Sequence, residues 1–172
     1  AKIAAQVKKF DPTLYFEKKE LRHTDLFAQY AVAAAEQAVA DSGIKERVEP
    51  TRFGVYIGSG IGGISTLLEN HLKQEEGKKV SPFMVPMMII NMAAGLVSMR
   101  FGAKGPTLPI VTACATSSHS IGEAYRAIAH GYADAILAGG TEAAVCPLTI
   151  AGFSSCMALT ANEDPKTACI PF

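Results

Sequence analysis

The fold is decided by residues 107–140, whose sequence is TLPIVTACATSSHSIGEAYRAIAHGYADAILAGG. The apolar run Thr107–Thr112 predicts a strand, and Ala115–His130 predicts a helix that ends at Gly131. A second short apolar run, at residues 135–138, predicts another strand that ends at a pair of glycines. A strand, a helix and a strand in this order require a crossover connection, which makes the two strands parallel in one sheet. The stretch therefore predicts an α/β fold.

The preceding residues continue this alternation of helices and strands. Thr24 is the expected N-cap of an Ala-rich helix that runs to about Ser42. The apolar run Phe53–Ile57 predicts a strand that opens into a glycine-rich turn. Ser81–Pro86 is expected to be a loop, because its two prolines exclude a central strand, and Met87–Phe101 is expected to form one buried helix. Together these segments predict a largely parallel sheet packed by helices.

Length and composition describe a folded chain with few charges. The chain has 172 residues, of which 49% are hydrophobic and 19% are charged. This length suits one domain, and such high hydrophobicity excludes a disordered protein. The charged fraction lies below the roughly 25% of an average soluble domain. We therefore expect one domain over residues 1–172, with part of its surface facing a partner or more chain.

Charge and cysteine content narrow the classes of partner. Lysine plus arginine and aspartate plus glutamate each total 16, so the net charge is zero and no overall field attracts nucleic acid or an anionic membrane. No apolar stretch approaches the roughly 18–20 residues of a membrane span, and residues 1–10 are no signal peptide. The four cysteines form no Cys-x-x-Cys pair, which argues against zinc and favours reduced thiols. We expect a cytoplasmic protein that binds no metal, membrane or nucleic acid.

A glycine-rich turn follows the strand predicted at residues 53–57. Gly58, Gly60 and Gly63 satisfy the GxGxxG pattern of a dinucleotide-binding turn. That pattern also needs a second strand ending in an acidic residue about 20 residues later. Residues 73–79 form a charged turn instead. A nucleotide-binding module is therefore the weaker interpretation, and glycines that let backbone segments pass close to one another are the stronger one.

Cys114 lies at the junction between the predicted strand and helix of residues 107–130. Such an elbow raises its side chain above the sheet, and the free amides of the helix N-terminus favour an anion there. Both effects suit a thiolate nucleophile, and a small buried cysteine is the structural alternative. His119, the nearest histidine in sequence, lies about 140° around the helix from Cys114 and is poorly placed as its base. The base for such a nucleophile is therefore missing from this chain.

A set of motifs runs along the whole chain. Its most specific member is Thr112–Ala124, around the cysteine. The other members are Gly58–Gly63, Ser81-Pro82-Phe83, Val85-Pro86, Asn91–Gly95, Gly105-Pro106 and Ala138–Glu142. This set resembles the β-ketoacyl-acyl carrier protein synthases, the condensing enzymes of fatty acid synthesis, and the type II enzymes more than type I. The resemblance favours Cys114 as a nucleophile over the buried cysteine.

The resemblance implies an acyltransferase, a 3-oxoacyl-[acyl-carrier-protein] synthase. Cys114 would take an acyl chain from acyl carrier protein as a thioester, with its backbone N–H as one oxyanion donor. Malonyl-acyl carrier protein would then lose carbon dioxide, and its carbanion would attack the thioester. No cofactor is expected. The histidines and the lysine that support decarboxylation lie in the family's C-terminal half.

The fold implied by the resemblance is thiolase-like, a duplicated αβαβα unit with two sheets between layers of helices. This chain is similar to most of the first, N-terminal copy, and we expect that copy to be incomplete at both ends. The implied partners are acyl carrier protein, the C-terminal half of the same enzyme and a second subunit in a homodimer. We expect residues 1–172 alone to be inactive in condensation.

Five further positions have roles that the resemblance implies. Ile61 and Phe153 match residues that flank the acyl pocket, and Met84 matches a position that reaches into the pocket of a neighbouring subunit. Many relatives carry Phe there, and a flexible thioether leaves the preferred chain length open. Lys19 and Arg22 match basic positions where the acidic carrier protein docks, and a solvated helix start is the alternative.

Two other functions compete with the condensing enzyme. A non-catalytic chain-length-factor-like partner subunit would share the fold, but such subunits typically replace the cysteine that this chain has at Cys114. A nucleotide-binding module would need the acidic strand end that does not follow the glycine-rich turn. Cys114 therefore favours the condensing enzyme.

Overall fold

The computed structural model describes residues 1–170, which belong to two compact units. The larger unit is Pro12–Ala143, and the smaller one combines Ala1–Asp11 with the chain from Ala144 onward. The α-helices are α1 (Lys18–Leu21), α2 (Leu26–Ser42), α3 (Ile64–Glu75), α4 (Met84–Met88), α5 (Met92–Phe101), α6 (Thr116–Ala129) and α7 (Pro147–Ser155). The strands are β1 (Phe53–Gly58) and β2 (Ala135–Gly140), and short 3-10 helices cover Pro12–Leu14, Ile44–Glu46, Pro50–Arg52 and Ala113–Ala115. Within residues 1–170, no helix is both long and apolar enough to cross a membrane.

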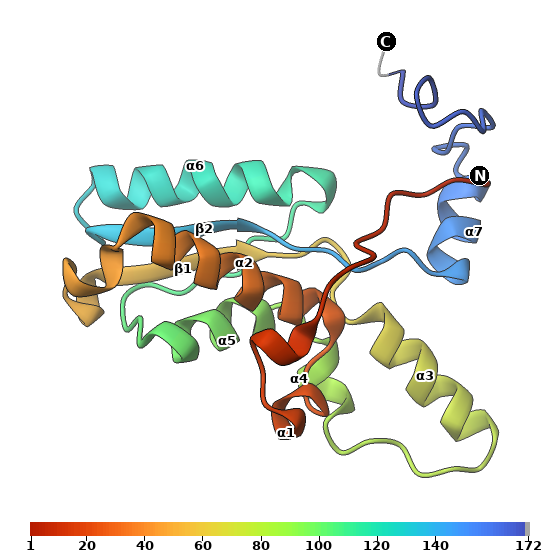
Figure 1. The fold of residues 1–172 in the computed structure, drawn as a ribbon, viewed down its shortest axis with the longest axis horizontal. Helices are drawn as coiled ribbons and strands as arrows, with labels where there is room; N and C mark the ends of the chain where they lie inside the picture. Colours follow the sequence, from red (N-terminus) through yellow and green to blue (C-terminus); the bar gives the residue numbers. More distant parts are fainter. Residues whose placement is uncertain (171–172) are drawn as a thin grey trace. The chain divides into compact units, whose positions relative to one another are not determined.

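The two strands form a parallel sheet in the larger unit (Figure 1). The register pairs Phe53 with Ala135 and Gly58 with Gly140, so both strands end at the same edge. In Figure 1, α6 covers one face of the sheet, and α2 and α5 lie on the other. The predicted α/β arrangement with parallel strands is therefore confirmed.

The side chains of β1 alternate between the two faces of the sheet, as the period of two in a strand requires. Phe53, Val55 and Ile57 pack with α2 and α5 in the main core. Tyr56 faces the opposite side, where it packs with Ala124 and Ala127 of α6. All six residues of β1 are buried, so this strand lies at the centre of the unit.

The start of α2 lies one residue later than the sequence predicts. Asp25, and not Thr24, is the N-cap, and its Oδ1 accepts a hydrogen bond from the Phe27 N–H at 3.3 Å. Its Oδ2 accepts from the N–H and the hydroxyl of Thr66 at 3.1 and 2.6 Å, which joins α2 to α3. Thr24 instead accepts hydrogen bonds from the side-chain amide of Gln29. A carboxylate can accept all three of these hydrogen bonds, whereas a hydroxyl oxygen has only two acceptor lone pairs.

The strand predicted at Thr107–Thr112 is wrong in its extent. Only one parallel bridge forms, between Thr107 and Val55 of β1, and the Leu108 N–H donates to the Val55 carbonyl at 3.0 Å. Alternate residues donate in a parallel ladder, so the next donor to β1 would be Ile110. No bond from its N–H to β1 forms within the described residues, and its carbonyl lies against Gly58 instead. The segment still lies beside β1 and leads to the edge at which both strands end.

The segment Met87–Phe101 forms parts of two helices and not one. The first, α4, begins at Met84, so the second half of the expected loop Ser81–Pro86 is helical, and α5 begins only at Met92. Between them the backbone of Ile89 is extended, with a ψ of 137°. Apolar residues continue through this break, so hydrophobic periodicity alone does not reveal it.

The smaller unit contains α7 and both terminal segments of the described chain. An ion pair joins Lys2 to Glu163, with 2.5 Å between Nζ and Oε1. An open cavity of about 660 Å³ lies between the two segments, and its wall includes Ile3, Met157 and Ile170. Contacts between the amino-terminal and the last described residues therefore define this unit.

The backbone passes very close to other segments at the end of β1. A Cβ on Gly58 would lie 1.7 Å from the carbonyl oxygen of Ile110 and 2.7 Å from the Cγ2 of Thr116. No side chain fits there, because real Cβ contacts essentially never fall below 3.0 Å. Gly58 thereby lets β1, the segment before Cys114 and the start of α6 meet. The interpretation of the glycine-rich turn as a site of close backbone approach is confirmed.

We expect Gly58→Ala to destabilise the fold by about 3 kcal/mol, because the added methyl group overlaps backbone atoms that cannot move aside. Gly95→Ala is the matched control, since Gly95 lies inside α5 and its added Cβ would have no atom within 4 Å. Alanine there should be neutral or stabilise the helix by about 0.5–1 kcal/mol. Urea denaturation followed by circular dichroism measures both changes. Equal midpoints for Gly58→Ala and the wild type would contradict the close approach.

Candidate functional site

Cys114 lies in the 3-10 helix Ala113–Ala115, at the turn into α6. Its side chain is exposed in this structure, so the alternative of a small buried cysteine is wrong. Ala113, directly before it, has a φ of 51°, in the left-handed region that residues other than glycine rarely adopt. Backbone strain of this kind costs about 1–3 kcal/mol and is concentrated at functional sites. The structure therefore has a strained elbow where the sequence predicts one.

Hydrogen bonds fix the backbone around this elbow. The Thr112 N–H donates to the Oγ1 of Thr116 at 2.9 Å, and the Ala115 N–H donates to the Thr112 carbonyl at 3.1 Å. The Nδ1 of His119 lies 2.8 Å from the Oγ1 of Thr112, so this histidine contacts the residue two positions before Cys114. The N–H of Cys114 has no acceptor among residues 1–170. This N–H can therefore bind a developing oxyanion at the start of α6.

A carboxylate that follows β2 holds the glycine-rich loop Gly58–Gly63. The Oε2 of Glu142 accepts hydrogen bonds from the N–H groups of Gly60 and Ile61 at 2.9 and 3.0 Å. Its Oε1 accepts from the hydroxyl of Ser59 at 3.1 Å. Amides that would bind a phosphate in a dinucleotide-binding turn are thus occupied by an internal anion. This contact argues against the nucleotide-binding interpretation.

Sequence reasoning missed Glu142 as a site residue. In the sequence it is only the last member of the motif Ala138–Glu142. The available signal was an acidic residue directly beyond a strand that ends in two glycines. The sequence does not show which residues this carboxylate contacts, because the loop lies more than 80 residues away and is brought close only by the pairing of β2 with β1.

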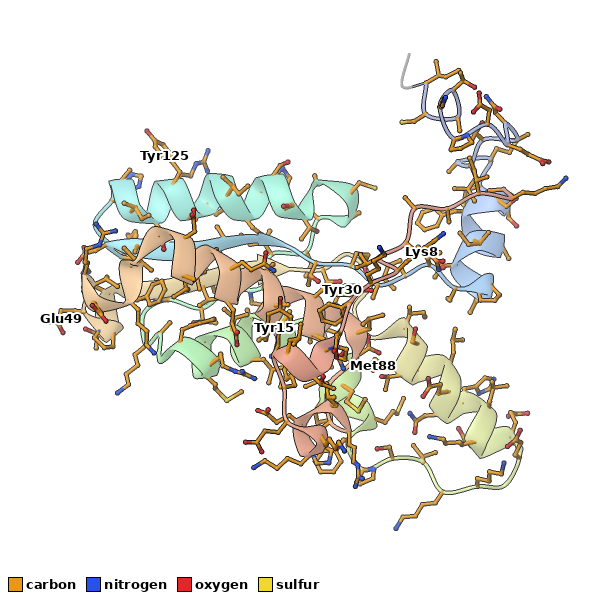
Figure 2. The ribbon with its side chains drawn as sticks, in the orientation of Figure 1. Lys8, Tyr15, Tyr30, Glu49, Met88 and Tyr125 are labelled. Carbon is orange, nitrogen blue, oxygen red and sulfur yellow. The ribbon has the colours of Figure 1, made fainter. Side chains whose placement is uncertain are left out.

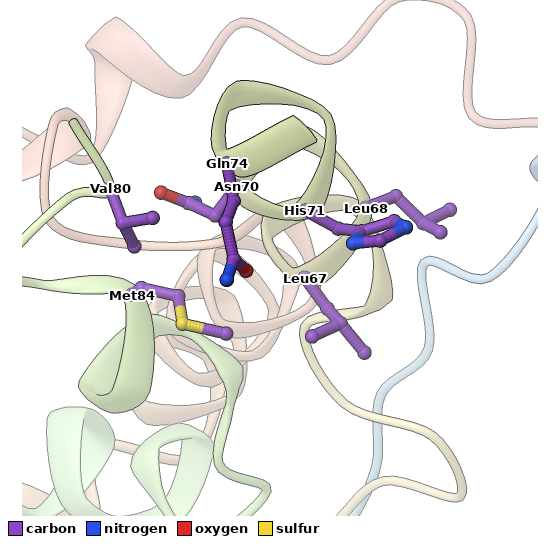
Figure 3. A pocket seen from close by; sticks show the side chains of 7 residues that line it. All are labelled: Leu67, Leu68, Asn70, His71, Gln74, Val80 and Met84. Atoms are coloured by element: carbon purple, nitrogen blue, oxygen red, sulfur yellow. The ribbon is translucent and has the colours of Figure 1, made fainter. Parts of the chain in front are cut away.

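Ile61 and Met84, the pocket candidates of the larger unit, are both half-buried. Met84 lines a cavity of about 270 Å³ beside α3 (Figure 3). The other lining residues are Leu67, Leu68, Asn70, His71, Gln74 and Val80. The thioether thus lies against α3 of its own chain, and its reach into a neighbouring subunit stays a prediction. Ile61 follows Gly60 in the loop that Glu142 holds.

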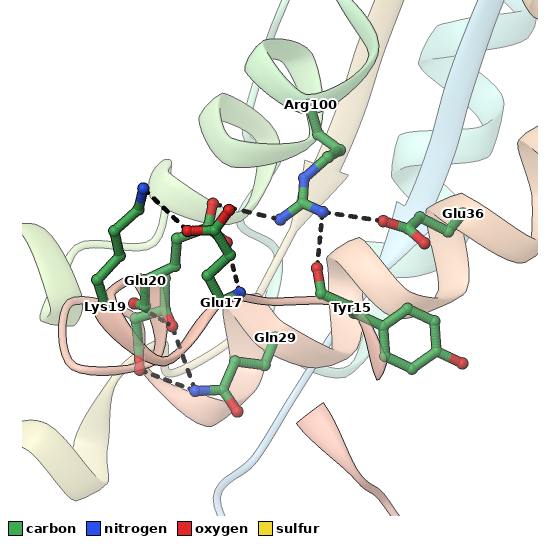
Figure 4. A network of polar contacts seen from close by, with 8 residues as sticks. Tyr15, Glu17, Lys19, Glu20, Gln29, Glu36 and Arg100 are labelled. Carbon is green, nitrogen blue, oxygen red and sulfur yellow. Dashed lines mark hydrogen bonds and ion pairs between the residues drawn. The ribbon is translucent and has the colours of Figure 1, made fainter. Parts of the chain in front are cut away.

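Arg100 of α5 anchors the amino-terminal segment of the larger unit (Figure 4). Its guanidinium donates to the Tyr15 carbonyl at 2.6 Å and to the Glu36 carboxylate at 3.1 Å, and it lies 3.5 Å from Glu20 of α1. It also lies over the ring of Phe16, 5.0 Å from the centroid. The guanidinium is only partly exposed, so water screens these contacts less than it screens a surface ion pair. Arg100 therefore fixes α1, which carries the predicted docking cations.

Lys19 and Arg22, the candidates for carrier-protein docking, are both exposed at α1. The Lys19 ammonium lies 2.9 Å from Glu17, and the hydrogen bond between them raises the pKa of Lys19 and lowers that of Glu17. Arg22 forms no ion pair within the described part of the chain. The adjacent His23 stacks on Phe83, with ring centroids 3.7 Å apart. The charge of Arg22 is thus open to a partner, whereas that of Lys19 is shared with Glu17.

Residues 1–172 match the protein family described as "Beta-ketoacyl synthase, N-terminal domain". The chain belongs to this family. The 3-oxoacyl-[acyl-carrier-protein] synthase 2 of Coxiella burnetii is 48% identical over 174 residues, which cover 99% of this chain and 42% of that protein. The protein of the same name from Staphylococcus aureus is also 48% identical, and the match covers 99% of this chain and 43% of the relative. The chain therefore spans less than half the length of these curated relatives.

Two solved structures share the fold of this β-ketoacyl synthase domain. The crystal structure of a beta-ketoacyl synthase from Burkholderia phymatum STM815 has a TM-score of 0.79 and 30% identity, and the match covers 94% of this chain and 40% of that one. A type II PKS acyl-carrier protein in complex with its ketosynthase, bound to the hexaketide, gives a TM-score of 0.75 at 25% identity, with 86% and 43% covered. These similarities confirm the predicted thiolase-like α/β fold class.

The four cysteines of the β-ketoacyl synthase domain are all free thiols. Cys114, Cys156 and Cys169 are exposed, and Cys146 is half-buried. Within residues 1–170, no group of three or more His, Cys, Asp or Glu side chains is placed to hold a metal ion.

The helix α7 carries one predicted site residue and one cysteine for which sequence reasoning found no role. Phe153 is 44% exposed; it belongs to the smaller unit, and its place beside the acyl pocket stays a prediction. Cys146 is the N-cap of α7, and its Sγ lies 3.4 Å from the Oγ1 of Thr149. The hydrogen bond with the Thr149 hydroxyl, together with the backbone amides of Thr149 and Leu148, lowers the pKa of the Cys146 thiol. A cysteine before a Pro-initiated helix, with Thr at the third position, was the available signal.

We expect Thr149→Val to raise the pKa of Cys146, because it removes the hydroxyl that stabilises the thiolate. The rate of iodoacetamide alkylation of Cys146, followed by mass spectrometry from about pH 6 to 10, should rise at a higher pH in the variant. Thr149→Ser retains the hydroxyl and should keep the wild-type profile. The profile of Cys156 is the internal control and should not change. Coincident Cys146 profiles in Thr149→Val and the wild type would contradict this assignment.

Proposed function

We propose that residues 1–172 form the N-terminal condensing-enzyme domain of a 3-oxoacyl-[acyl-carrier-protein] synthase, an acyltransferase of fatty acid synthesis. The observation that carries the proposal is Cys114, exposed on a strained elbow at the start of α6 beside its own unbonded N–H. Relatives that are 48% identical have this activity in their names. The same thiol argues against a non-catalytic chain-length-factor-like subunit.

Cys114 would act as the nucleophile in acyl transfer. Its thiolate attacks the carbonyl carbon of a carrier-bound thioester, a new carbon–sulfur bond forms, and the thiolate of the carrier leaves. The negative charge that develops on the carbonyl oxygen would be stabilised by the N–H of Cys114 at the positive end of α6. Exchange of one thioester for another is nearly balanced in energy, so the acyl group can wait on the cysteine for the second substrate.

The condensation step would need groups from outside residues 1–172. Malonyl-acyl carrier protein loses carbon dioxide, and the electron pair of the broken carbon–carbon bond becomes the carbanion that attacks the Cys114 thioester. The Cys114 thiolate then leaves, and the product is a 3-oxoacyl chain, longer by one acetyl unit, on the carrier. The histidines and the lysine that the resemblance assigns to decarboxylation belong to a C-terminal half.

Two apolar surfaces of the larger unit support a C-terminal half as a partner. The outer face of α6 exposes Ile121, Tyr125 and Ile128, with 56%, 74% and 42% of their surfaces accessible, and Figure 2 shows Tyr125 pointing away from the sheet. Their helical spacing makes them one stripe. The free edge of β2 also borders an open groove of about 270 Å³, lined mostly by Ala and Gly residues. Curated relatives are more than twice as long as this chain, so they contain enough further chain to cover both surfaces.

The remaining site residues take their proposed roles from the family. Ile61 and Phe153 would flank the acyl chain, and Met84 would reach the pocket of a neighbouring subunit in a homodimer. Acyl carrier protein, in its acyl and malonyl forms, would dock at Lys19 and Arg22, and the similarity to a ketosynthase solved with its acyl-carrier protein supports this partner. Free thiols suit a reducing compartment, which supports the cytoplasm as the location.

We expect acyl-acyl carrier protein to acylate Cys114 in the full-length protein, in which the proposed C-terminal half follows this chain. Mass spectrometry of the cysteine peptide would show the added acyl mass. Cys114→Ala should lower the rate of condensation by about 1,000-fold or more, because no thiol remains to form the intermediate. Cys156→Ala removes an exposed thiol outside the elbow and should keep the wild-type rate. Residues 1–172 alone should give only background decarboxylation. Wild-type condensation by Cys114→Ala would overturn the proposal.

Charge reversal at Lys19 and Arg22 tests the docking site. We expect Lys19→Glu and Arg22→Glu to raise the apparent KM for carrier-bound acyl chains several-fold, because the acidic carrier loses an attractive surface. The apparent KM for the same acyl chains on coenzyme A should not change. Lys45→Glu is the matched control, since Lys45 lies beyond the far end of α2, which is about 25 Å long. Equal effects on both kinds of substrate would contradict docking at α1.

A further inference from the structure

Glu142 lies just beyond β2, at the edge where both strands end. Its Oε2 accepts hydrogen bonds from the N–H groups of Gly60 and Ile61, and its Oε1 accepts one from the hydroxyl of Ser59. Ser59 is 1% exposed, and its Oγ in turn accepts a hydrogen bond from the N–H of Gly62 at 3.0 Å. One carboxylate thus satisfies three donors of a loop that has no regular secondary structure of its own.

The loop that Glu142 holds lies directly against the elbow. A Cβ on Gly60 would lie 3.0 Å from the Glu142 Oε2 and 3.5 Å from the carbonyl oxygen of Ala113, the strained residue before Cys114. A side chain at Gly60 would therefore be tight against the carboxylate and in contact with the elbow. A shift of the loop would be passed on to Ala113.

The backbone that carries Glu142 is itself fixed on two sides. The Thr141 N–H donates to the carbonyl of Gly58 at 3.0 Å. The Thr141 hydroxyl donates to the carbonyl of Phe27 in α2 at 2.5 Å. The carboxylate therefore extends from a rigid position to the loop. Hydrogen bonds to a charged acceptor are roughly twice as strong as those between neutral groups, so a carboxylate holds this loop more firmly than a water molecule would.

We propose that Glu142 is a positioning residue for acyl transfer, which sets the loop that carries Ile61 against the elbow of Cys114. This inference rests on the function proposed above. Glu142 does not touch the reacting atoms, and its side chain is exposed and outside the hydrophobic core. Its removal is therefore expected to disturb the geometry of the site more than the stability of the fold.

Two substitutions at Glu142 distinguish the effect of its hydrogen bonds from the effect of its negative charge. Glu142→Ala removes all three acceptor contacts. Glu142→Gln can keep them, because its carbonyl oxygen can replace Oε2 and its amide group can donate to the Oγ of Ser59. Glu123→Ala is the matched control: it removes another exposed glutamate of the same unit, whose carboxylate bonds to Arg126 on α6.

The test uses the full-length protein and its variants. In Glu142→Ala we expect amide hydrogen exchange at Gly60 and Ile61 to become about tenfold faster or more, and kcat for acylation of Cys114 to fall by a similar factor. The KM for acyl-acyl carrier protein and the urea midpoint should stay close to the wild type. Glu142→Gln should recover most of both losses, and Glu123→Ala should show neither.

Each other outcome has a defined meaning. Unchanged amide exchange at Gly60 and Ile61 in Glu142→Ala would overturn the positioning role, whatever the activity. Faster exchange with an unchanged kcat would show that the contact is not needed for acyl transfer. An equal fall in kcat in Glu142→Ala and Glu142→Gln would contradict the claim that the hydrogen-bond geometry, and not the charge, positions the loop. Failure of the wild type to acylate Cys114 would instead overturn the proposed function, and the exchange data would still report on the contact.

Discussion

Close backbone contact at the end of β1 is the constraint on which the rest of the structure depends. Gly58 admits the carbonyl of Ile110 so closely that a Cβ would lie 1.7 Å from its oxygen. This contact brings β1, the segment before Cys114 and the first turn of α6 to one edge of the sheet. The strained backbone at Ala113 is held there by the hydrogen bonds that Thr112 makes with Thr116 and Ala115. With any side chain at Gly58, the elbow would have to move away from the sheet.

Polar groups at the same edge are satisfied from within the chain. Glu142 accepts hydrogen bonds from the amides of the glycine-rich loop, and the hydroxyl of Thr116 accepts one from the N–H of Thr112. The N–H of Cys114, in contrast, has no acceptor among residues 1–170. A glycine-rich turn after a strand is a general anion site, and a nucleotide phosphate is only one of the anions that can occupy it. The GxGxxG pattern is therefore present here for the sake of an internal carboxylate and a close backbone contact.

The low charge of the sequence has a visible counterpart in the larger unit. The outer stripe of α6 consists of the exposed apolar residues Ile121, Tyr125 and Ile128. A helix face in contact with water usually has charged side chains at such positions. The neighbouring face, about 100° around the same helix, is packed on the sheet through Ala124 and Ala127. A helix with such a wide apolar surface is typical of a buried helix, and this one is buried on one face only. The match to less than half of each curated relative agrees with that asymmetry.

The sequence by itself determined the α/β order and the span of α6, and it singled out Cys114 as the proposed nucleophile. These inferences rest on local periodicity, helix ends and one specific motif. It also indicated that the glycines serve close packing. Only the tertiary structure decided that Thr107–Thr112 pairs once, that Met87–Phe101 breaks at Ile89, and that the thiol of Cys114 is exposed. The role of Glu142 was likewise decided by tertiary structure. Its partners are more than 80 residues away, and nothing local to a carboxylate shows which distant amides the folding of two strands will place beside it.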